Sequence, residues 1–500
     1  MEKLKYFTNN RFTESAADKF YKVYDPSTGE HIADCPRLTL DEVKQVIANA
    51  EKAYPAWADT PVKNRVQILY KVKQLIEKNL EELTLLVAKE HGKVYEEAKG
   101  DVLKAMEATE LAISTIITTM GESIMDASKG YDTVMYREPL GVFAGIAPFN
   151  FPAMIPMGWM APNCIAAGNT MVLKVSGATP MTSLRFCELY REAGLPDGVL
   201  NVFSCGKEEV AELLINPAIK GISFVGSTKV GRHIYATGAA NGKRVQALCE
   251  AKNHALVLAD APIDRAAAGI INAAFGCAGE RCMALPVVVV QEEIADRLVA
   301  KLKELASALK IGPAYDKTSK LGPVYSPEHK QAVIKRIEEG IAEGAELVLD
   351  GRNITVKGFE NGFYLGPTIL DKVTPEMDVG ISEIFGPVLC VKRVKDFEEG
   401  LKVMNASPFG NGSVIYTRSG YYAREFAKRT IAGMVGINVG IPVPISVFPF
   451  CGHKNSFFGD LHCLGKDAYR FYTESKAVTT HWFDEEEAQS TKVSTWDGTI

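Results

Sequence analysis

Phe224-Val225-Gly226-Ser227-Thr228-Lys229-Val230-Gly231 joins a short apolar run to a helical stretch. Similar runs alternate with helical stretches on both sides of it, from Val142 to Ala259. This alternation is typical of a parallel sheet that is covered by helices. The sequence therefore predicts an α/β fold, with strands at Val142 to Ile146, Thr170 to Leu173, Val199 to Phe203, Gly221 to Val225, Val245 to Leu248 and Ala255 to Leu258.

A second alternating region, at about residues 263 to 438, predicts another sheet of the same kind. The first third of the chain is instead predicted to be helical. It contains the capping-box pattern Thr39-Leu40-Asp41-Glu42, and apolar residues at helical spacing predict one longer helix from Ile68 to Val87. Two further segments, near Tyr131 to Tyr136 and at Lys476 to Phe483, are predicted to be strands.

Length and composition limit the class of protein. A chain of 500 residues is too long for one ordinary core, so we expect two or three domains. A net charge of -5 gives no basic surface for nucleic acid, and no apolar run is long enough to cross a membrane. The ten cysteines form no Cys-x-x-Cys pair, which argues against zinc and favours free thiols in a reducing cytoplasm.

The segment Gly279-Glu280-Arg281-Cys282-Met283-Ala284 carries the strongest chemical signal. As a thiolate, Cys282 would be a nucleophile, and the neighbouring Arg281 guanidinium could hold an anionic substrate. The alternative is a buried, inert thiol.

Three other segments give weaker signals. Pro148 and Pro152 stiffen the backbone around Asn150, whose amide could donate to a developing oxyanion. Lys174 follows a predicted parallel strand, at the end where ligands bind in open α/β sheets. The turn at Gly226 and Ser227 would present backbone N–H groups to a phosphate. Each segment alone also fits an ordinary turn or surface position.

Together and in this order, these segments resemble the aldehyde dehydrogenase superfamily, from Asp25 to Tyr472. The most similar branch is that of the CoA-acylating malonate and methylmalonate semialdehyde dehydrogenases. Its marks are Ala147-Pro148-Phe149-Asn150-Phe151-Pro152, Ala251-Lys252-Asn253-His254, the Cys282 segment and Ser456-Phe457-Phe458-Gly459.

The resemblance implies a role for each motif. Cys282 would attack the aldehyde carbon, and the Asn150 amide with the Cys282 backbone N–H would stabilise the oxyanion. NAD would be bound by residues of the matching motifs, namely Lys174, Ser227, Gly226, Phe149, Glu383 and Phe385.

The resemblance also implies an aldehyde dehydrogenase-like α/β architecture, with two doubly wound domains and a small β flap for oligomerisation. We expect an NAD-binding domain at 1–118 and 140–250, a catalytic domain at 251–455, and a flap and tail at 119–139 and 456–500. The exposed edge of such a flap predicts a homodimer or homotetramer.

One departure from the family decides the expected acyl acceptor. Hydrolytic members activate water with a glutamate, but Leu248 stands at that position and can take no proton. A thiol needs less activation than water, so CoA is the expected acceptor. Glu250, two residues later, would restore a base if it reached the site from the same strand face. Otherwise it would pair with Lys252 or Arg244.

Two more departures concern the ligands. The branch holds the substrate carboxylate with two arginines, and this chain has Arg281 and Lys104. Lysine is a point charge rather than a bidentate fork, which leaves the shape of the anionic aldehyde open. Gly177 replaces a glutamate that discourages a 2′-phosphate, so NADP is an alternative to NAD.

The sequence thus predicts a cytoplasmic enzyme that oxidises an acid semialdehyde with NAD and passes the acyl group to CoA. With malonate or methylmalonate semialdehyde, the product would be acetyl-CoA or propionyl-CoA, with loss of carbon dioxide. The alternatives are a hydrolytic, acid-forming aldehyde dehydrogenase and a non-catalytic binding protein on the same fold.

Overall fold

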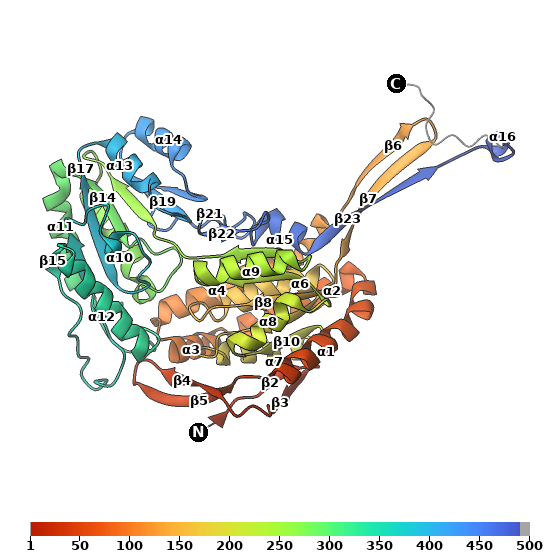
Figure 1. The fold of residues 1–500 in the computed structure, drawn as a ribbon, viewed down its shortest axis with the longest axis horizontal. Coiled ribbons are helices and arrows are strands. Elements are labelled where there is room, and N and C mark those ends of the chain that lie inside the picture. The colour runs from red at the N-terminus through yellow and green to blue at the C-terminus, as the bar shows by residue number, and fades with distance from the viewer. Residues whose placement is uncertain (1, 491–500) are drawn as a thin grey trace.

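Two large, mainly parallel sheets lie side by side in the computed structural model, which describes residues 2–490 (Figure 1). Residues 491–500 of the predicted tail lie outside this range. The first sheet has eight strands in the order β22-β12-β11-β8-β9-β10-β2-β3. Its parallel centre is formed by β8 (Val142–Ile146), β9 (Thr170–Lys174), β10 (Leu200–Phe203), β11 (Ile219–Val225) and β12 (Arg244–Leu248). The antiparallel edge strands are β2 (Tyr6–Thr8), β3 (Arg11–Thr13) and β22 (Phe457–Phe458).

Side chains alternate from face to face along a strand, and apolar side chains of this sheet point to both faces. Helices therefore cover both faces. In β8, Phe143 packs into one buried cluster and Ala144 into another. The Ala144 face is covered by α1 (Leu40–Asp59), α8 (Lys207–Ile215) and α9 (Thr228–Ala240). The Phe143 face is covered by α2 (Val62–Lys78), α3 (Leu80–His91), α4 (Tyr95–Ile113), α6 (Ala161–Ala166) and α7 (Met181–Glu192).

The second sheet has seven strands. In order they are β15 (Glu346–Leu349), β16 (Thr368–Asp371), β17 (Val388–Val394), β14 (Val287–Gln291), β13 (His254–Val257), β19 (Gly412–Tyr416) and β20 (Met434–Ile437). All pairs are parallel except β15 with β16. One face packs on α10 (Ile263–Phe275) and α11 (Glu292–Ser307). The other packs on α12 (Pro327–Ala342), α13 (Phe397–Asn405) and α14 (Gly420–Arg429). The predicted α/β class with parallel sheets is confirmed.

Two predictions for the first third of the chain are wrong. The single helix expected from Ile68 to Val87 is two helices, α2 and α3, because Asn79 ends α2 by donating its side-chain amide to the Leu75 carbonyl. The N-terminal region also contains β1 (Glu2–Lys3), β4 (Phe20–Asp25) and β5 (Glu30–Pro36), which form a separate small sheet. These strands are mostly half-exposed, so no apolar run marks them in the sequence.

A three-stranded antiparallel flap projects from the body, on the side away from the seven-stranded sheet (Figure 1). It consists of β6 (Glu122–Ser128), β7 (Tyr131–Pro139) and β23 (Thr473–His481), and it confirms the two strands predicted there. Several large apolar side chains of the flap are exposed, among them Ile124, Met125, Tyr136 and Val478. The root of the flap is tied to β12, because the Arg244 guanidinium donates to the carbonyls of Arg470, Phe471 and Thr473.

The remaining short elements are α5 (Thr115–Thr118), β18 (Phe409–Gly410), β21 (His453–Lys454), α15 (Gly465–Phe471), α16 (Glu485–Ala488), a π-helix at Ile155–Met160 and 3-10 segments at Gly276–Gly279 and Asp378–Gly380. Across residues 2–490, no helix has both the length and the apolar character that a membrane span requires. All ten cysteines are free thiols, and all except Cys282 and Cys451 are buried.

Candidate active site

The Cys282 thiol follows a tight turn at the end of α10. In this turn Cys277 and Ala278 both have left-handed backbones, with φ of 50° and 52°. Gly279 comes next, and a Cβ there would lie 2.1 Å from the Gly386 carbonyl oxygen, so only glycine fits. The turn therefore directs the chain from the end of α10 to the cysteine, which is partly buried.

Two asparagines fix the backbone at the cysteine. The Asn253 side-chain amide donates to the carbonyls of Cys282, at 2.9 Å, and Ala284, at 2.7 Å. Its oxygen accepts from the Gly412 N–H. Asn411 donates to the Cys282 carbonyl as well, at 3.1 Å. The sequence alone indicates no role for either asparagine, although Asn253 lies in one of the segments that carry the family resemblance.

Burial raises the pKa of the Cys282 thiol to about 12, and the nearby Glu383 carboxyl adds to the shift. The backbone N–H groups of Cys282 and Met283 and the Arg281 guanidinium act in the opposite direction. The protonated thiol is therefore the resting form of this structure at neutral pH. A nucleophilic thiolate requires a change in the charge around it.

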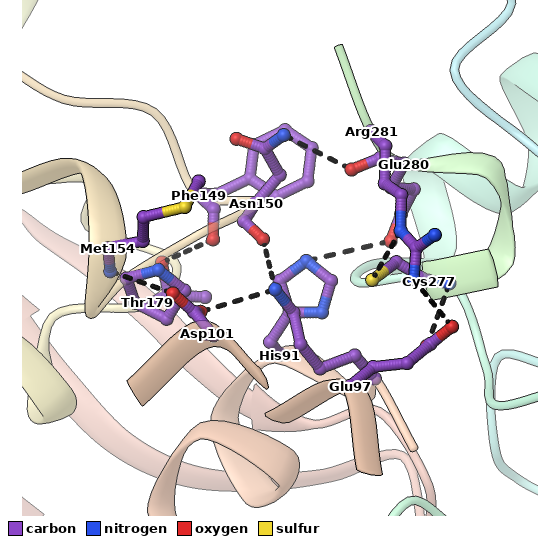
Figure 2. Close-up of polar contacts among 12 residues, drawn as sticks. His91, Glu97, Asp101, Phe149, Asn150, Met154, Thr179, Cys277, Glu280 and Arg281 are labelled. Atoms are coloured by element: carbon purple, nitrogen blue, oxygen red, sulfur yellow. Dashed lines mark hydrogen bonds and ion pairs between the residues drawn. The ribbon is translucent and has the colours of Figure 1, made fainter. Parts of the chain in front are cut away.

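The Asn150 side chain lies next to the cysteine segment and is held there (Figure 2). Its amide donates to the Glu280 carbonyl at 3.1 Å. The Asn150 main-chain carbonyl accepts from the Lys93 ammonium at 2.6 Å, and Lys93 also pairs with the buried Asp101. Asp101 in turn accepts from the Met154 N–H. An amide that is fixed in this way needs little reorganisation to meet a developing negative charge.

Glu280 and His91 form a buried polar pair behind this contact (Figure 2). Glu280 Oε2 lies 3.8 Å from His91 Nε2, and Oε1 lies 3.5 Å from His329 Nε2 and accepts from the Tyr325 N–H. Burial raises the pKa of the Glu280 carboxyl and lowers that of the His91 imidazole. Both shifts favour the neutral forms, so burial opposes an ion pair between the two groups.

The Arg281 guanidinium is already paired with an acid (Figure 2). It donates to Glu97 at 2.8 Å and to the Cys277 sulfur at 3.2 Å. The second Glu97 oxygen accepts from the Cys277 N–H. Glu97 thus links α4 to the turn that precedes the nucleophile, a contact between residues far apart in the sequence.

Lys104 lies on the same face of α4 as Glu97, since seven residues make two helical turns. Its ammonium pairs with Glu107 at 2.6 Å. The other Glu107 oxygen accepts from the Ser446 N–H and hydroxyl. Both cations predicted to hold the substrate carboxylate are thus held by carboxylates of the chain itself.

Gly226 and Ser227 form the turn from β11 into α9, as the sequence predicts. Ser227 is the N-cap of α9, but its own side chain makes no capping hydrogen bond. Glu250 takes that position instead: its Oε2 accepts from the Thr228 N–H at 3.1 Å. The predicted same-face geometry fails because β12 ends at Leu248, before Glu250.

The pairing of Glu250 with a neighbouring cation is also wrong. The Lys252 ammonium donates to the Val379 carbonyl, and the Arg244 guanidinium is used at the root of the flap. In residues 2–490 no lysine, arginine or histidine forms an ion pair with Glu250. The carboxylate is balanced instead by the amide at the first turn of α9.

Glu383 precedes β17 and accepts from the Ala251 N–H at 3.1 Å. Burial raises the pKa of this carboxyl to about 8, and the negative charge of Glu250 adds to the shift. Glu383 therefore contacts the short link between β12 and β13, the link that contains Glu250.

Phe149 and Phe385 are in contact, with ring centroids 5.9 Å apart in an edge-to-face arrangement. Phe149 also stacks on Tyr325 at 3.7 Å. The Phe385 carbonyl accepts from His329 Nε2 at 2.7 Å. The two predicted cofactor residues thus belong to one aromatic cluster beside Asn150.

Lys174 ends β9, and burial lowers the pKa of its ammonium. Among residues 2–490, no carboxylate pairs with it. The space beside Gly177 is filled by the Tyr21 ring, which would lie 2.2 Å from an added Cβ. The Tyr21 hydroxyl donates to the Cys205 carbonyl at 3.2 Å.

The topology places these groups along the boundary between the two large sheets, which we call the seam. Lys174 is the last residue of β9, and Asn150 and Ser227 follow β8 and β11, so all three lie at the carboxyl ends of parallel strands in the eight-stranded sheet. Cys282 and Glu383 precede the amino ends of strands in the seven-stranded sheet. Ligands in α/β folds bind outside the carboxyl ends of strands, which agrees with a binding site at this seam.

Comparison with known proteins agrees over nearly the whole chain. The sequence model of the Aldehyde dehydrogenase family matches residues 12–478. Malonate-semialdehyde dehydrogenase 2 of Geobacillus kaustophilus is 48% identical over 482 residues, 96% of this chain and 99% of the relative. Malonate-semialdehyde dehydrogenase 1 of Oceanobacillus iheyensis is 45% identical over 95% of this chain and 98% of the relative.

Two solved structures have the same fold. Methylmalonate-semialdehyde dehydrogenase of Oceanimonas doudoroffii superposes with a TM-score of 0.95 and 41% identity, over 98% of this chain and 100% of the other. A Sinorhizobium meliloti protein assigned to the same activity, complexed with NAD, also has a TM-score of 0.95 and 41% identity, over 97% and 99% of the two chains.

We predict that Glu280→Gln stabilises the protein increasingly as the pH rises. The folded state keeps the Glu280 proton after the unfolded chain, with a pKa of about 4.3, has released it, so the wild type loses stability between these two pKa values. Glutamine has no proton to lose. The free energy of unfolding, measured by denaturant titration from about pH 5 upward, should differ by up to ~1.4 kcal/mol more per pH unit until the Glu280 carboxyl ionises in the folded protein.

The control is Glu293→Gln, which makes the same substitution at an exposed position of α11 and should give a constant difference. A Glu280→Gln difference that stayed constant across this pH range would contradict a protonated, buried Glu280.

Proposed function

This chain belongs to the aldehyde dehydrogenase family, and we propose that it oxidises malonate or methylmalonate semialdehyde with NAD and transfers the acyl group to CoA. The relatives of that name, which match at full length, support the substrate class. The observation that carries the choice of CoA is Leu248. It ends β12 within the buried apolar cluster against which Cys282 packs, and it offers no base for water.

The residues of the site support a thioester route. The Cys282 thiol first gives its proton to solvent, and the thiolate then attacks the aldehyde carbon. The Asn150 amide and the Cys282 N–H stabilise the resulting oxyanion. Each such donor is typically worth about 3 kcal/mol of barrier. NAD supplies the acceptor for the hydride. The acyl group then remains on the Cys282 sulfur as a thioester.

The CoA thiol attacks this thioester and releases the cysteine. For malonate semialdehyde, the carboxylate leaves as carbon dioxide, and the carbon that carried it takes up a proton. Semialdehyde, NAD and CoA thus give acetyl-CoA, carbon dioxide and NADH. Methylmalonate semialdehyde gives propionyl-CoA in the same way.

The residues present fit a nicotinamide dinucleotide. The Lys174 ammonium has no carboxylate partner among residues 2–490 and is free to meet ribose hydroxyls. The first turn of α9, after Gly226 and Ser227, suits a phosphate. We propose that Glu383 holds the second ribose, with Phe149 and Phe385 beside the nicotinamide. Gly177 carries no acid to repel a 2′-phosphate, so NADP is the alternative to be assayed.

We propose that Arg281 and Lys104 bind the substrate carboxylate. Arg281 contacts Glu97 of α4, and Lys104 lies on the same face of that helix about 10 Å further along, so both positive groups face the same side of α4. Each cation already has a carboxylate partner, Glu97 or Glu107, which orients the cation and lowers its net attraction. Selection for an acid semialdehyde over a neutral aldehyde should then be moderate.

The decisive assay follows NADH formation from malonate semialdehyde with and without CoA. We expect CoA to raise the steady-state rate at least about a hundredfold, because Leu248 leaves the water step without a general base. Cys282→Ala should abolish NADH formation with and without CoA. Propanal and NADP serve as the comparison substrate and cofactor.

Equal NADH turnover without CoA, with release of the free acid, would overturn the acylating proposal in favour of a hydrolytic enzyme that uses Glu250. Aldehyde oxidation that survived in Cys282→Ala would remove the thioester route. No NADH from any aldehyde in the folded wild type would favour a binding protein.

Asn150→Ala should lower kcat by about 10² to 10³, the usual effect of losing one oxyanion donor. The substrate KM should change little, because the donor acts on a charge that develops after binding. Since the Asn150 amide also braces the Glu280 carbonyl, the melting temperature of the variant should be measured alongside. An Asn150→Ala enzyme with wild-type kcat would exclude the oxyanion role.

We also propose that the flap joins copies of this chain into a homodimer or a pair of dimers. The exposed apolar side chains of β6 and β23 and the free edge of β6 favour pairing with another chain. Light scattering coupled to size exclusion should give a mass of two or four chains. Ile124→Glu, an exposed change within the flap, should shift the protein toward monomer at micromolar concentration. A wild-type monomer would contradict the proposal.

A further inference from the structure

The Glu250 carboxylate occupies the N-terminus of α9. Its Oε2 accepts from the Thr228 N–H, the first amide of a thirteen-residue helix. The amides of a first helical turn have no partner within the helix and attract negative charge. Glu250 is therefore the anion that this helix end holds when no other anion is present.

The backbone around Glu250 is fixed, while its side chain is not. The Glu250 carbonyl accepts from the Ser456 hydroxyl at 2.7 Å, and the Ser456 carbonyl accepts from the Cys249 N–H at 2.8 Å. The Thr228 hydroxyl donates to the Asn455 carbonyl, so the residues just before β22 also fix the start of α9. The carboxylate can leave the helix end only by rotating its own half-exposed side chain.

The charge of Glu250 is not compensated by a cation in residues 2–490. The Arg232 guanidinium, on α9, donates to the Asn455 side chain, and Lys252 donates to the Val379 carbonyl. The negative charge of Glu250 raises the pKa of the Glu383 carboxyl and of the buried Cys249 thiol. A second anion at this helix end would thus meet a negative charge that no cation pairs with and would compete with it for the same amide.

We propose that Glu250 is an internal competitor of the cofactor pyrophosphate: its carboxylate caps α9 in the cofactor-free enzyme and weakens dinucleotide binding. The inference rests on the proposed function, because it takes the turn at Gly226 and Ser227 as the phosphate site. The incoming pyrophosphate displaces the carboxylate from the Thr228 N–H. When the carboxylate returns, it favours release of NADH.

The test is the dissociation constant for NAD, measured by titration calorimetry on the intact wild type and on Glu250→Gln. Glutamine keeps the shape of the side chain and an oxygen for the Thr228 N–H, but it removes the charge. We expect Glu250→Gln to bind NAD about five- to tenfold more tightly at low salt. The gain should shrink at about 1 M salt, where charges are screened within about 3 Å.

The matched control is Glu293→Gln on α11, which removes one negative charge far from α9 in the fold and should leave the constant unchanged. Stopped-flow release of NADH should be slower from Glu250→Gln by a similar factor. Equal or weaker NAD binding by Glu250→Gln, with normal binding by the wild type, would overturn this inference alone. A wild type that does not bind NAD would overturn the proposed function along with it.

Discussion

The hydrogen bond from the Asn150 amide to the Glu280 carbonyl joins the two large sheets where the site lies. Asn150 follows a strand of the eight-stranded sheet, and Glu280 belongs to the segment that enters the seven-stranded sheet. Lys93 donates to the Asn150 carbonyl and pairs with Asp101, so it fixes the Asn150 end of this hydrogen bond. This contact, together with the link from Glu97 to Arg281 and the Cys277 N–H, therefore sets the position of the cysteine relative to the eight-stranded sheet.

The surroundings of the site are rich in acids for a protein proposed to bind anions. Glu97 is neutralised by Arg281, and Glu280 by keeping its proton in a buried place. Glu250 is balanced by the end of a helix, and burial favours the protonated form of Glu383. Four acids are thus accommodated by an ion pair, a helix dipole and desolvation. Each of these three effects makes the ionisation of its carboxyl depend differently on pH and on salt concentration.

Local patterns in the sequence predicted the strands well, because burial of an apolar run is a local property. The run from Val142 to Ile146 is strand β8, and the turn at Gly226 and Ser227 leads into α9 as expected. The break at Asn79 depends on one side-chain hydrogen bond that periodicity does not register. The end of β12 at Leu248 was predicted correctly, but the strand geometry was extended past it to Glu250, whose contact with the Thr228 N–H joins separate segments of the chain.

The site was predictable where a motif names its residues and unpredictable where distant segments meet. The motifs identify Cys282 and Asn150, and the structure brings their segments together; their catalytic roles remain predictions. The clamp by Asn253 and Asn411 and the pairing of Glu97 with Arg281 join residues far apart in the chain. No local spacing encodes such contacts, so only the folded structure reveals them.

The left-handed backbone at Cys277 and Ala278 lowers the stability of the protein but fixes the orientation of the nucleophile. A left-handed backbone costs a residue with a side chain roughly 1–2 kcal/mol, and here two such residues are adjacent. Glycine at position 278 would relieve part of that strain and would also loosen the turn that aims the thiol. In this segment, a substitution that made the protein more stable would therefore leave the Cys282 thiol less precisely oriented.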